Sequence, residues 1–216
     1  MKALRQQQRE AAAARQRSRD RRNLLITAGI IAVFGLAILF VALYLNHQSQ
    51  VASANRLSFH TVTGTVGTAV PDEGPATHIT PGTSWNYKFY PPTSGPHWLV
   101  PGSAPAPWQD TTETLAEGQF VHNLEHGGVA ILYNCPSGGG CSTLKNQLEN
   151  YVKNLAPQEP NFGKVKMVMT PYSTGMGSHK IALLAWHYIM FLDSYDQNAI
   201  TQFYENHVDQ GPEQIA

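Results

Sequence analysis

A long uncharged run near the start of the sequence, Leu24–Leu45, restricts what the chain can fold into more than any other feature. As a helix, these 22 residues would extend about 33 Å, enough to cross a hydrocarbon core of roughly 30 Å. Several arginines lie just before the run, and basic residues keep their end of a span in the cytoplasm. We therefore expect a single-pass plasma-membrane protein with a cytoplasmic tail at 1–23, a transmembrane helix at 24–45 and an extracytoplasmic remainder.

A cleaved secretory signal is the alternative interpretation of the same run. Ala52, Ser53 and Ala54 offer a small-x-small cleavage pattern, but the run is longer than the roughly 7–15 apolar residues of a cleavable signal. In both interpretations the segment that follows lies on the extracytoplasmic side. We expect residues 46–58 to form a polar tether and residues 59–216 to form one extracytoplasmic domain.

Charge is distributed unevenly along this chain of zero net charge. Eight basic and two acidic side chains precede residue 46, whereas seven basic and thirteen acidic side chains follow it. A nucleic-acid-binding domain needs its positive charge on the folded part, so the acidic outer segment excludes a nucleic-acid partner. The basic tail is expected to rest on anionic lipid headgroups, and the partner that the sequence indicates is the membrane itself.

The outer segment divides into a proline-rich half and a half with regular periodicity. Nine of the fourteen prolines lie between Pro71 and Pro107, which predicts ordered loops and short strands there. Later segments predict strands at Gly128–Tyr133, Lys164–Thr170 and the first part of Ile181–Leu192, and helices beginning at Ser142 as N-cap and at Asp196. These elements lack a βαβ alternation. They predict an α+β fold, with a small, mostly antiparallel sheet and about two helices packed on it.

Cys135 and Cys141 bracket a short Pro-Ser-Gly-Gly-Gly segment. In an oxidising compartment they are expected to form a disulfide, which would contribute about 2 kcal/mol on the chain-entropy estimate. Paired metal ligands are the alternative, although the spacing is wider than in most zinc sites. Two cysteines in total exclude both a disulfide-dense scaffold and a four-cysteine zinc ribbon.

Several histidines lie in distinctive short motifs. PPTSGPH follows Tyr90 and ends at His97, and VHNLEHGGV contains His122, Glu125 and His126; further along come the pairs Ala185-Trp186 and Pro212-Glu213. In this order the motifs resemble the domain-of-unknown-function family 3105, found in bacterial and some archaeal proteins. The resemblance covers most of the outer domain. It implies a single N-terminal membrane anchor and carries no established activity, so the chemistry has to be argued from the residues.

These motif residues predict a transition-metal site whose ligands converge from separate loops. His97, His122 and His126 would supply three nitrogens, and His78 or Glu125 would complete the shell. Imidazole ligands suit zinc and copper best, and outside the cell we favour copper over zinc. The predicted function is metal handling or support of a membrane redox system.

Methionines could add thioether ligands for reduced copper. Met176 shares the glycine-bounded loop MGSH with His179, whereas Met167 and Met169 fit a packed core better. Among the remaining histidines, the sequence places His187 in a strand. It places three on the surface: His47, His60 and His207.

A metal-free interpretation is also open. The histidines would then be hydrogen-bonding braces in an accessory or interaction subunit of a membrane or envelope complex. Aromatic residues of the proline-rich half would pin loops or dock a partner: Trp85, Tyr87, Phe89, Tyr90, Trp98 and Trp108.

Catalysis is the minor interpretation. The sequence H-x-x-E-H matches the inverted zincin signature, which needs two ligating histidines one helical turn apart. The two glycines that follow, and the strand expected after them, argue against a long helix there, and an extended strand would separate the histidines by about 13 Å. Only a turn at Asn123 and Leu124 would bring both imidazoles together. Ser94 lacks the strand-turn-helix context of a hydrolase nucleophile. Whether the chain is an enzyme stays open, with a zinc-dependent hydrolase as the lesser alternative.

Overall fold

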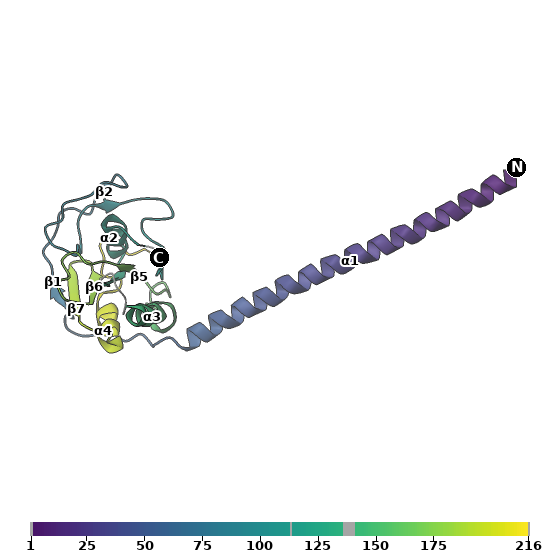
Figure 1. Cartoon of the computed structure of the whole chain (residues 1–216). Coiled ribbons are helices and arrows are strands. Elements are labelled where there is room, and N and C mark those ends of the chain that lie inside the picture. Colours follow the sequence, from purple (N-terminus) through teal and green to yellow (C-terminus); the bar gives the residue numbers. More distant parts are fainter. Residues whose placement is uncertain (1, 113, 136–140, 216) are drawn as a thin grey trace. The chain divides into compact units, whose positions relative to one another are not determined.

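The computed structural model describes residues 2–112, 114–135 and 141–215 of the chain, which divides into two compact units (Figure 1). The first unit, Met1–Val51, is made almost entirely of helix α1 (Lys2–Ala54). The second unit, Ala52–Ala216, contains all the strands and the other helices of the described chain. We call this second unit the globular domain.

Helix α1 contains the apolar run identified in the sequence. Its segment Arg15–His47 reaches a mean hydropathy of 2.8 in its most apolar part, and that part is not buried by protein. By length and composition, α1 can therefore be a membrane span or a signal sequence. The helix continues to Ala54, through most of the segment predicted as a tether. The chain joins the globular fold directly afterwards, because Arg56 donates hydrogen bonds to the carbonyls of Lys153 and Ala156.

A five-stranded sheet forms the centre of the globular domain, in the order β1-β7-β6-β4-β5. Its strands are β1 (Thr68–Ala69), β4 (Val129–Tyr133), β5 (Met167–Pro171), β6 (Ile181–Ala185) and β7 (Tyr188–Leu192). The pair β4–β5 is parallel, and the other neighbouring strands are antiparallel. The predicted α+β class with a mostly antiparallel sheet is confirmed.

The ambiguous stretch Ile181–Leu192 forms two strands. Strands β6 and β7 pair as a hairpin, with Ala185 opposite Tyr188 across a two-residue turn at Trp186 and His187. His187 turns the chain in the left-handed region, at φ 65. Its predicted place in a strand was wrong, because the residue is needed at the turn.

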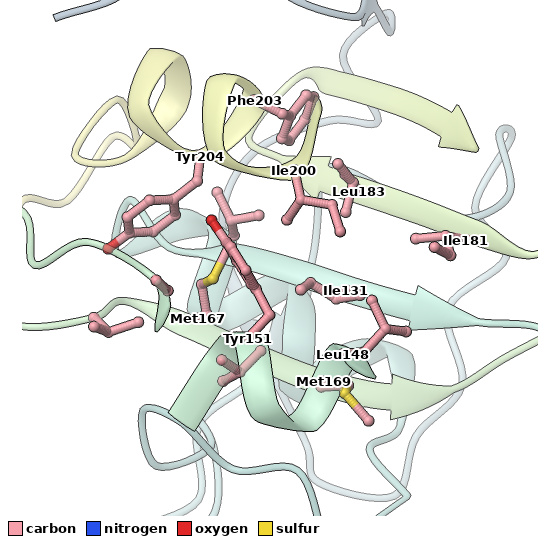
Figure 2. Close-up of a cluster of buried hydrophobic side chains, with 14 of the residues drawn as sticks. Ile131, Leu148, Tyr151, Met167, Met169, Ile181, Leu183, Ile200, Phe203 and Tyr204 are labelled. Carbon is pink, nitrogen blue, oxygen red and sulfur yellow. The ribbon is translucent and has the colours of Figure 1, made fainter. Parts of the chain in front are cut away.

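Alternate strand residues pack on opposite faces of the sheet, and both faces are covered. On one face, Ile131 of β4 contributes to a core with α3 (Ser142–Asn150), the π-helical turn η1 (Tyr151–Leu155) and α4 (Gln197–His207), as Figure 2 shows. The buried side chains that these helical segments contribute to this core include the following: Leu148, Tyr151, Val152, Ile200, Phe203 and Tyr204.

The opposite face of the sheet carries α2 (Glu117–Glu125), which the sequence did not predict (Figure 1). Phe120, Val121 and Leu124 of α2 pack against Ala130 and other small or branched residues of the strands. Within the described residues, α2 therefore joins α3 and α4 in covering the sheet.

The two predicted helix starts have different outcomes. Asp196 is the N-cap of α4, and its side chain accepts a hydrogen bond from the backbone N–H of Ala199. Helix α3 instead has Cys141 as its N-cap, so Ser142 is the first helical residue. Cys141 is joined to Cys135 by the predicted disulfide, which rules out paired thiolate ligands at these positions.

The proline-rich half forms ordered loops over residues 71–107, all of which the structure describes. Its regular structure is one parallel pair of two-residue strands, β2 (His78–Ile79) and β3 (His97–Trp98). Buried Glu73 organises the loops, because its carboxylate accepts hydrogen bonds from the backbone of Lys88 and Phe89. This pattern confirms the expectation of ordered loops with short strands.

Candidate metal centre

Helix α2 and the pair β2–β3 bring together the ligand candidates from three segments of the chain. His78 and His97 lie directly opposite each other in the β2–β3 register. His122 and Glu125 lie one turn apart on α2. Each of these four residues offers one ligand atom, and the four atoms lie within 4.8 Å of one another. We call His78, His97, His122 and Glu125 the His₃Glu cluster.

Glu125 lies at the centre of this cluster. Its Oε2 atom is 2.7 Å from Nε2 of His97, 3.7 Å from Nε2 of His122 and 3.9 Å from Nε2 of His78. Ligand atoms around a tetrahedral zinc ion, each bonded at about 2.0–2.1 Å, lie roughly 3.3 Å apart. The observed separations are close enough to this value for small side-chain rotations to complete the geometry.

Backbone carbonyls determine which ring nitrogen of two histidines carries the proton. Nδ1 of His97 lies 2.9 Å from the carbonyl oxygen of Gly95, and Nδ1 of His122 lies 2.6 Å from that of Trp98. Because a carbonyl can only accept, each Nδ1 donates, and the neutral ring keeps its lone pair on Nε2. Both Nε2 atoms face the cluster, which is the tautomer and orientation typical of metal-ligating histidines.

Two buried atoms at the centre of the cluster have no partner other than each other. They are Nε2 of His97 and Oε2 of Glu125, on residues only 0% and 3% exposed. In the neutral tautomer the nitrogen is an acceptor, and so is the carboxylate oxygen, so their 2.7 Å contact satisfies neither. A cation bonded to both atoms would satisfy both.

The protonation states also suit a cation. Burial, with repulsion from His126 and His97, lowers the pKa of His122 to about 4, so its ring is neutral at pH 7. Burial alone would raise the pKa of Glu125, but the side-chain hydrogen bond with His97, together with the electrostatic effect of the His97, His122 and His78 rings, outweighs it and holds that pKa below its usual value. A neutral imidazole and an ionised carboxylate are the ligand forms of both residues.

The glycines after α2 end the helix and do not prevent it. Gly127 adopts φ +74 and donates to the carbonyl of Leu124, while Gly128 donates to that of Asn123. This pair of bonds is a Schellman motif, a common way for a helix to end. Our argument against a helix at H-x-x-E-H was therefore wrong: Nε2 of His122 lies 3.1 Å from Nε2 of His126, far closer than an extended strand allows.

Comparison with known proteins agrees with the motifs. The model of the family described as "Protein of unknown function (DUF3105)" matches residues 78–216, which include every candidate ligand. The chain belongs to the DUF3105 family. Searches of curated proteins and of solved structures found no significant match.

In this DUF3105 protein, His126 lies beside the His₃Glu cluster and outside it. Its Nε2 is 3.5 Å from a carboxylate oxygen of Glu213, and His126, Glu213 and Glu125 form a second group whose ligand atoms lie within 4.8 Å. The sequence put His126 among the three principal ligands, whereas the structure gathers His78 with His97 and His122. The sequence did not single out Glu213 as a ligand, although it belongs to the Pro212-Glu213 pair of the family motifs.

The methionines that the sequence offered as thioether ligands lie away from the His₃Glu cluster. Met167 and Met169 pack in the core on the opposite face of the sheet from α2, as expected of core residues. Met176 is fully buried in the hydrophobic cluster on the α2 face. His179, its neighbour in the MGSH loop, pairs with exposed Asp193.

Other candidate residues have structural roles. Ser94 is buried, and its hydroxyl accepts a hydrogen bond from the backbone N–H of Glu73. His60 is exposed as predicted, but the prediction for His207 was wrong. His207 is buried on the inner side of α4, where its Nε2 lies 2.6 Å from the carbonyl oxygen of Val66.

A cavity of about 370 Å³ is lined in part by the residues that follow two cluster ligands in the sequence. Ile79 follows His78, and Trp98 follows His97; the further lining includes the aromatic residues Trp85, Tyr87 and Tyr172. Trp98 therefore has two roles: its carbonyl orients the His122 ring, and the residue lines the cavity.

Proposed function

We propose that the globular domain binds a divalent transition-metal ion, copper or zinc, through the His₃Glu cluster. In this proposal α1 anchors the domain at the plasma membrane, on the extracytoplasmic side. The domain there handles metal or supports a membrane redox system. The observation that carries the proposal is the pair of buried, unpartnered ligand atoms, Nε2 of His97 and Oε2 of Glu125.

A network of structural braces explains this pair less well than a metal ion does. As a brace, His97 needs a proton on both ring nitrogens, so that Nδ1 donates to Gly95 and Nε2 donates to Glu125, whereas as a metal ligand it needs a proton on Nδ1 alone. Burying a carboxylate without hydrogen bonds costs free energy, which a bound divalent cation offsets. The carbonyl of Gly95 then has the second role of holding the His97 ring in its ligand orientation.

The donor atoms favour a divalent ion over reduced copper. The cluster offers three imidazole nitrogens and one carboxylate oxygen, whereas copper(I) prefers sulfur. On a fixed set of nitrogen and oxygen ligands, divalent copper binds more tightly than zinc. We therefore expect the wild-type protein to prefer Cu²⁺ over Zn²⁺ in a competition at equal free concentrations.

The proposed location rests on α1 and on the disulfide. The arginines before the apolar run favour a cytoplasmic N-terminus. The bond between Cys135 and Cys141 is typical of an oxidising compartment. Protease treatment of intact spheroplasts or cells should therefore degrade the globular domain. Protection of this domain, with degradation only after the membrane is opened, would refute the orientation.

Metal content tests the proposed function directly. The full-length chain in detergent is stripped with EDTA, loaded separately with Zn²⁺ or Cu²⁺, desalted and measured by elemental mass spectrometry. Wild type should retain metal, and His97→Ala should lose it. His78→Ala keeps the buried core intact because the His78 side chain is 42% exposed, and it should weaken binding at least about 10-fold.

His60→Ala is the matched control, because His60 is an exposed histidine away from the cluster. It should retain as much metal as wild type. A wild-type protein that keeps no metal after loading, or a His78→Ala protein with unchanged affinity, would overturn the proposal. In the first case the metal-free interaction subunit becomes the better interpretation, with the aromatic cavity as its docking site.

A further inference from the structure

A second group of ligand atoms adjoins the His₃Glu cluster and shares one residue with it. Glu125, His126 and Glu213 each offer a ligand atom within 4.8 Å of the others. Nε2 of His126 is 3.5 Å from Oε2 of Glu213 and 3.1 Å from Nε2 of His122. Glu125 therefore lies between two sets of ligands.

The C-terminal segment that carries Glu213 is held tightly against the end of α2. The backbone N–H of Glu213 donates to the carbonyl of Glu125 at 3.0 Å, and that of Asp209 donates to the carbonyl of Gly127 at 2.8 Å. A side chain at Gly211 would overlap the backbone of Glu125 and Gly127, so only glycine permits this approach. The position of Glu213 is thus built into the fold.

Buried Lys166 reinforces this arrangement. Its Nζ lies 2.6 Å from Oδ1 of Asp209, and both residues are buried. Asn161 donates to the other carboxylate oxygen of Asp209 at 2.9 Å. The carboxylate of Asp209 is therefore occupied, and Glu125 and Glu213 are the acids left to face His126.

The ring tautomers show how the two sets of ligands are connected. His122 donates from Nδ1 to the carbonyl of Trp98, so its Nε2 can only accept from His126. Without metal, His126 must therefore carry its proton on Nε2. An ion bonded to Nε2 of His122 removes this acceptor. The proton of His126 can then move to Nδ1, which leaves Nε2 of His126 with a lone pair for a second ion.

We propose that the site is dinuclear: a second divalent transition-metal ion binds His126, Glu213 and Glu125, and Glu125 bridges the two ions. This inference rests on the proposed function of the His₃Glu cluster. Carboxylate-bridged pairs of ions in proteins lie about 3.5–4 Å apart. The two sets of ligands meet at Glu125, which both share, and at the contact between Nε2 of His122 and Nε2 of His126. The unpartnered Oε2 of buried Glu125 is the second observation that points to a ligand.

The second ion would have open coordination positions. It has three protein ligands, and the side chains of His126 and Glu213 are 11% and 49% exposed. An ion with three protein ligands and access to solvent completes its shell with water or with an exchangeable ligand. The buried ion would hold the site together, and the outer ion would meet small anionic or neutral ligands from solution.

Metal stoichiometry tests this inference separately from the first proposal. The full-length chain in detergent is titrated with Zn²⁺ against a chromophoric chelator, and bound zinc is confirmed by elemental analysis. Wild type should bind two ions per chain. Glu213→Gln and His126→Ala should each bind one, because the His₃Glu cluster remains. Asp193→Asn, which neutralises an exposed carboxylate paired with another histidine, should still bind two.

A spectroscopic measurement reports the distance between the ions. Loaded with two Cu²⁺ ions, the wild type should lose most of the normal mononuclear copper EPR signal, because two bridged ions couple magnetically. Glu213→Gln should show that signal at full intensity for its one ion. Glu213 is half exposed, so this variant is expected to fold.

The outcomes distinguish the two proposals. One ion per chain in wild type overturns the dinuclear inference and leaves the metal-binding function standing. Two ions in wild type and also in Glu213→Gln and His126→Ala would place the second ion elsewhere and also overturn the inference. No bound ion in wild type would overturn both proposals.

Discussion

Acidification of the metal-free protein should remove a defined part of its stability through His122. Its pKa is about 4 in the folded chain, against the ordinary histidine value of 6.5, because burial and the neighbouring rings of His126 and His97 disfavour the charged form. Between these two pH values the unfolded chain binds a proton at this residue and the folded chain does not. Stability must therefore fall as the pH decreases from about 6.5 to 4.

The size of the loss follows from the two pKa values. One pKa unit corresponds to about 1.4 kcal/mol, so the difference at His122 amounts to about 3 kcal/mol when the pH reaches the folded pKa. The His122 side chain is only 2% exposed, so solvent screens this effect little. His126 adds a loss of the same sign, because burial lowers its pKa as well. Glu125 adds to it at lower pH, where its depressed pKa makes the folded state resist protonation.

Urea unfolding at a series of pH values in the presence of EDTA measures this loss. All four tryptophans lie in the globular domain, so their fluorescence follows that domain even in the full-length chain. His122→Gln should lose about 3 kcal/mol less than wild type between pH 6.5 and 4. His60→Gln, at an exposed position, should behave like wild type. Coincident pH profiles for wild type and His122→Gln would refute the reasoning.

Four further substitutions test the fold by the same urea assay. Gly127→Ala should destabilise by about 2 kcal/mol or more, because the residue has φ +74 and a Cβ would lie 2.7 Å from Cα of Asp209; wild-type stability would contradict this. Lys166→Met should cost about 3–5 kcal/mol, since it leaves a buried carboxylate without its partner. Lys153→Met, at a partly exposed pair, should cost less than about 1 kcal/mol, and equal effects would disprove the distinction. Cys135→Ser should cost about 2 kcal/mol through loss of the disulfide, and an unchanged midpoint would show otherwise.

Periodicity predicted the elements whose packing is local. The alternation in Lys164–Thr170 and the apolar run Gly128–Tyr133 correspond to β5 and β4, because each strand presents alternate residues to two covered faces. The spacing of Ile200, Phe203 and Tyr204 likewise gave α4. Strand β7 was hidden because its turn uses Trp186 and His187 in place of the usual glycine or asparagine.

The candidate site was only partly visible in the sequence. The motifs supplied His97, His122 and Glu125, but the order of the chain does not show that His78 would pair with His97 across two short strands. Helix α2 was missed because Gly127 and Gly128 were interpreted as breaking a helix that they in fact end.

Glu213 was missed for a different reason. It reaches Glu125 only because the C-terminal segment passes close to the end of α2 at Gly211, a long-range contact that leaves no periodic signal in the sequence. His207 was placed at the surface because it is polar, whereas one helical turn from Phe203 it faces the core.

Trp98 links the floor of the aromatic cavity to the orientation of a ligand ring. Its indole packs so closely on Gly118 that a methyl group there would meet the ring at 2.7 Å, and its backbone oxygen is the acceptor that holds His122. A molecule that enters the cavity and displaces this indole would tilt the imidazole as well. By reciprocity, metal binding would then change the affinity of the cavity for that molecule. The cavity and the His₃Glu cluster would then be coupled through Trp98.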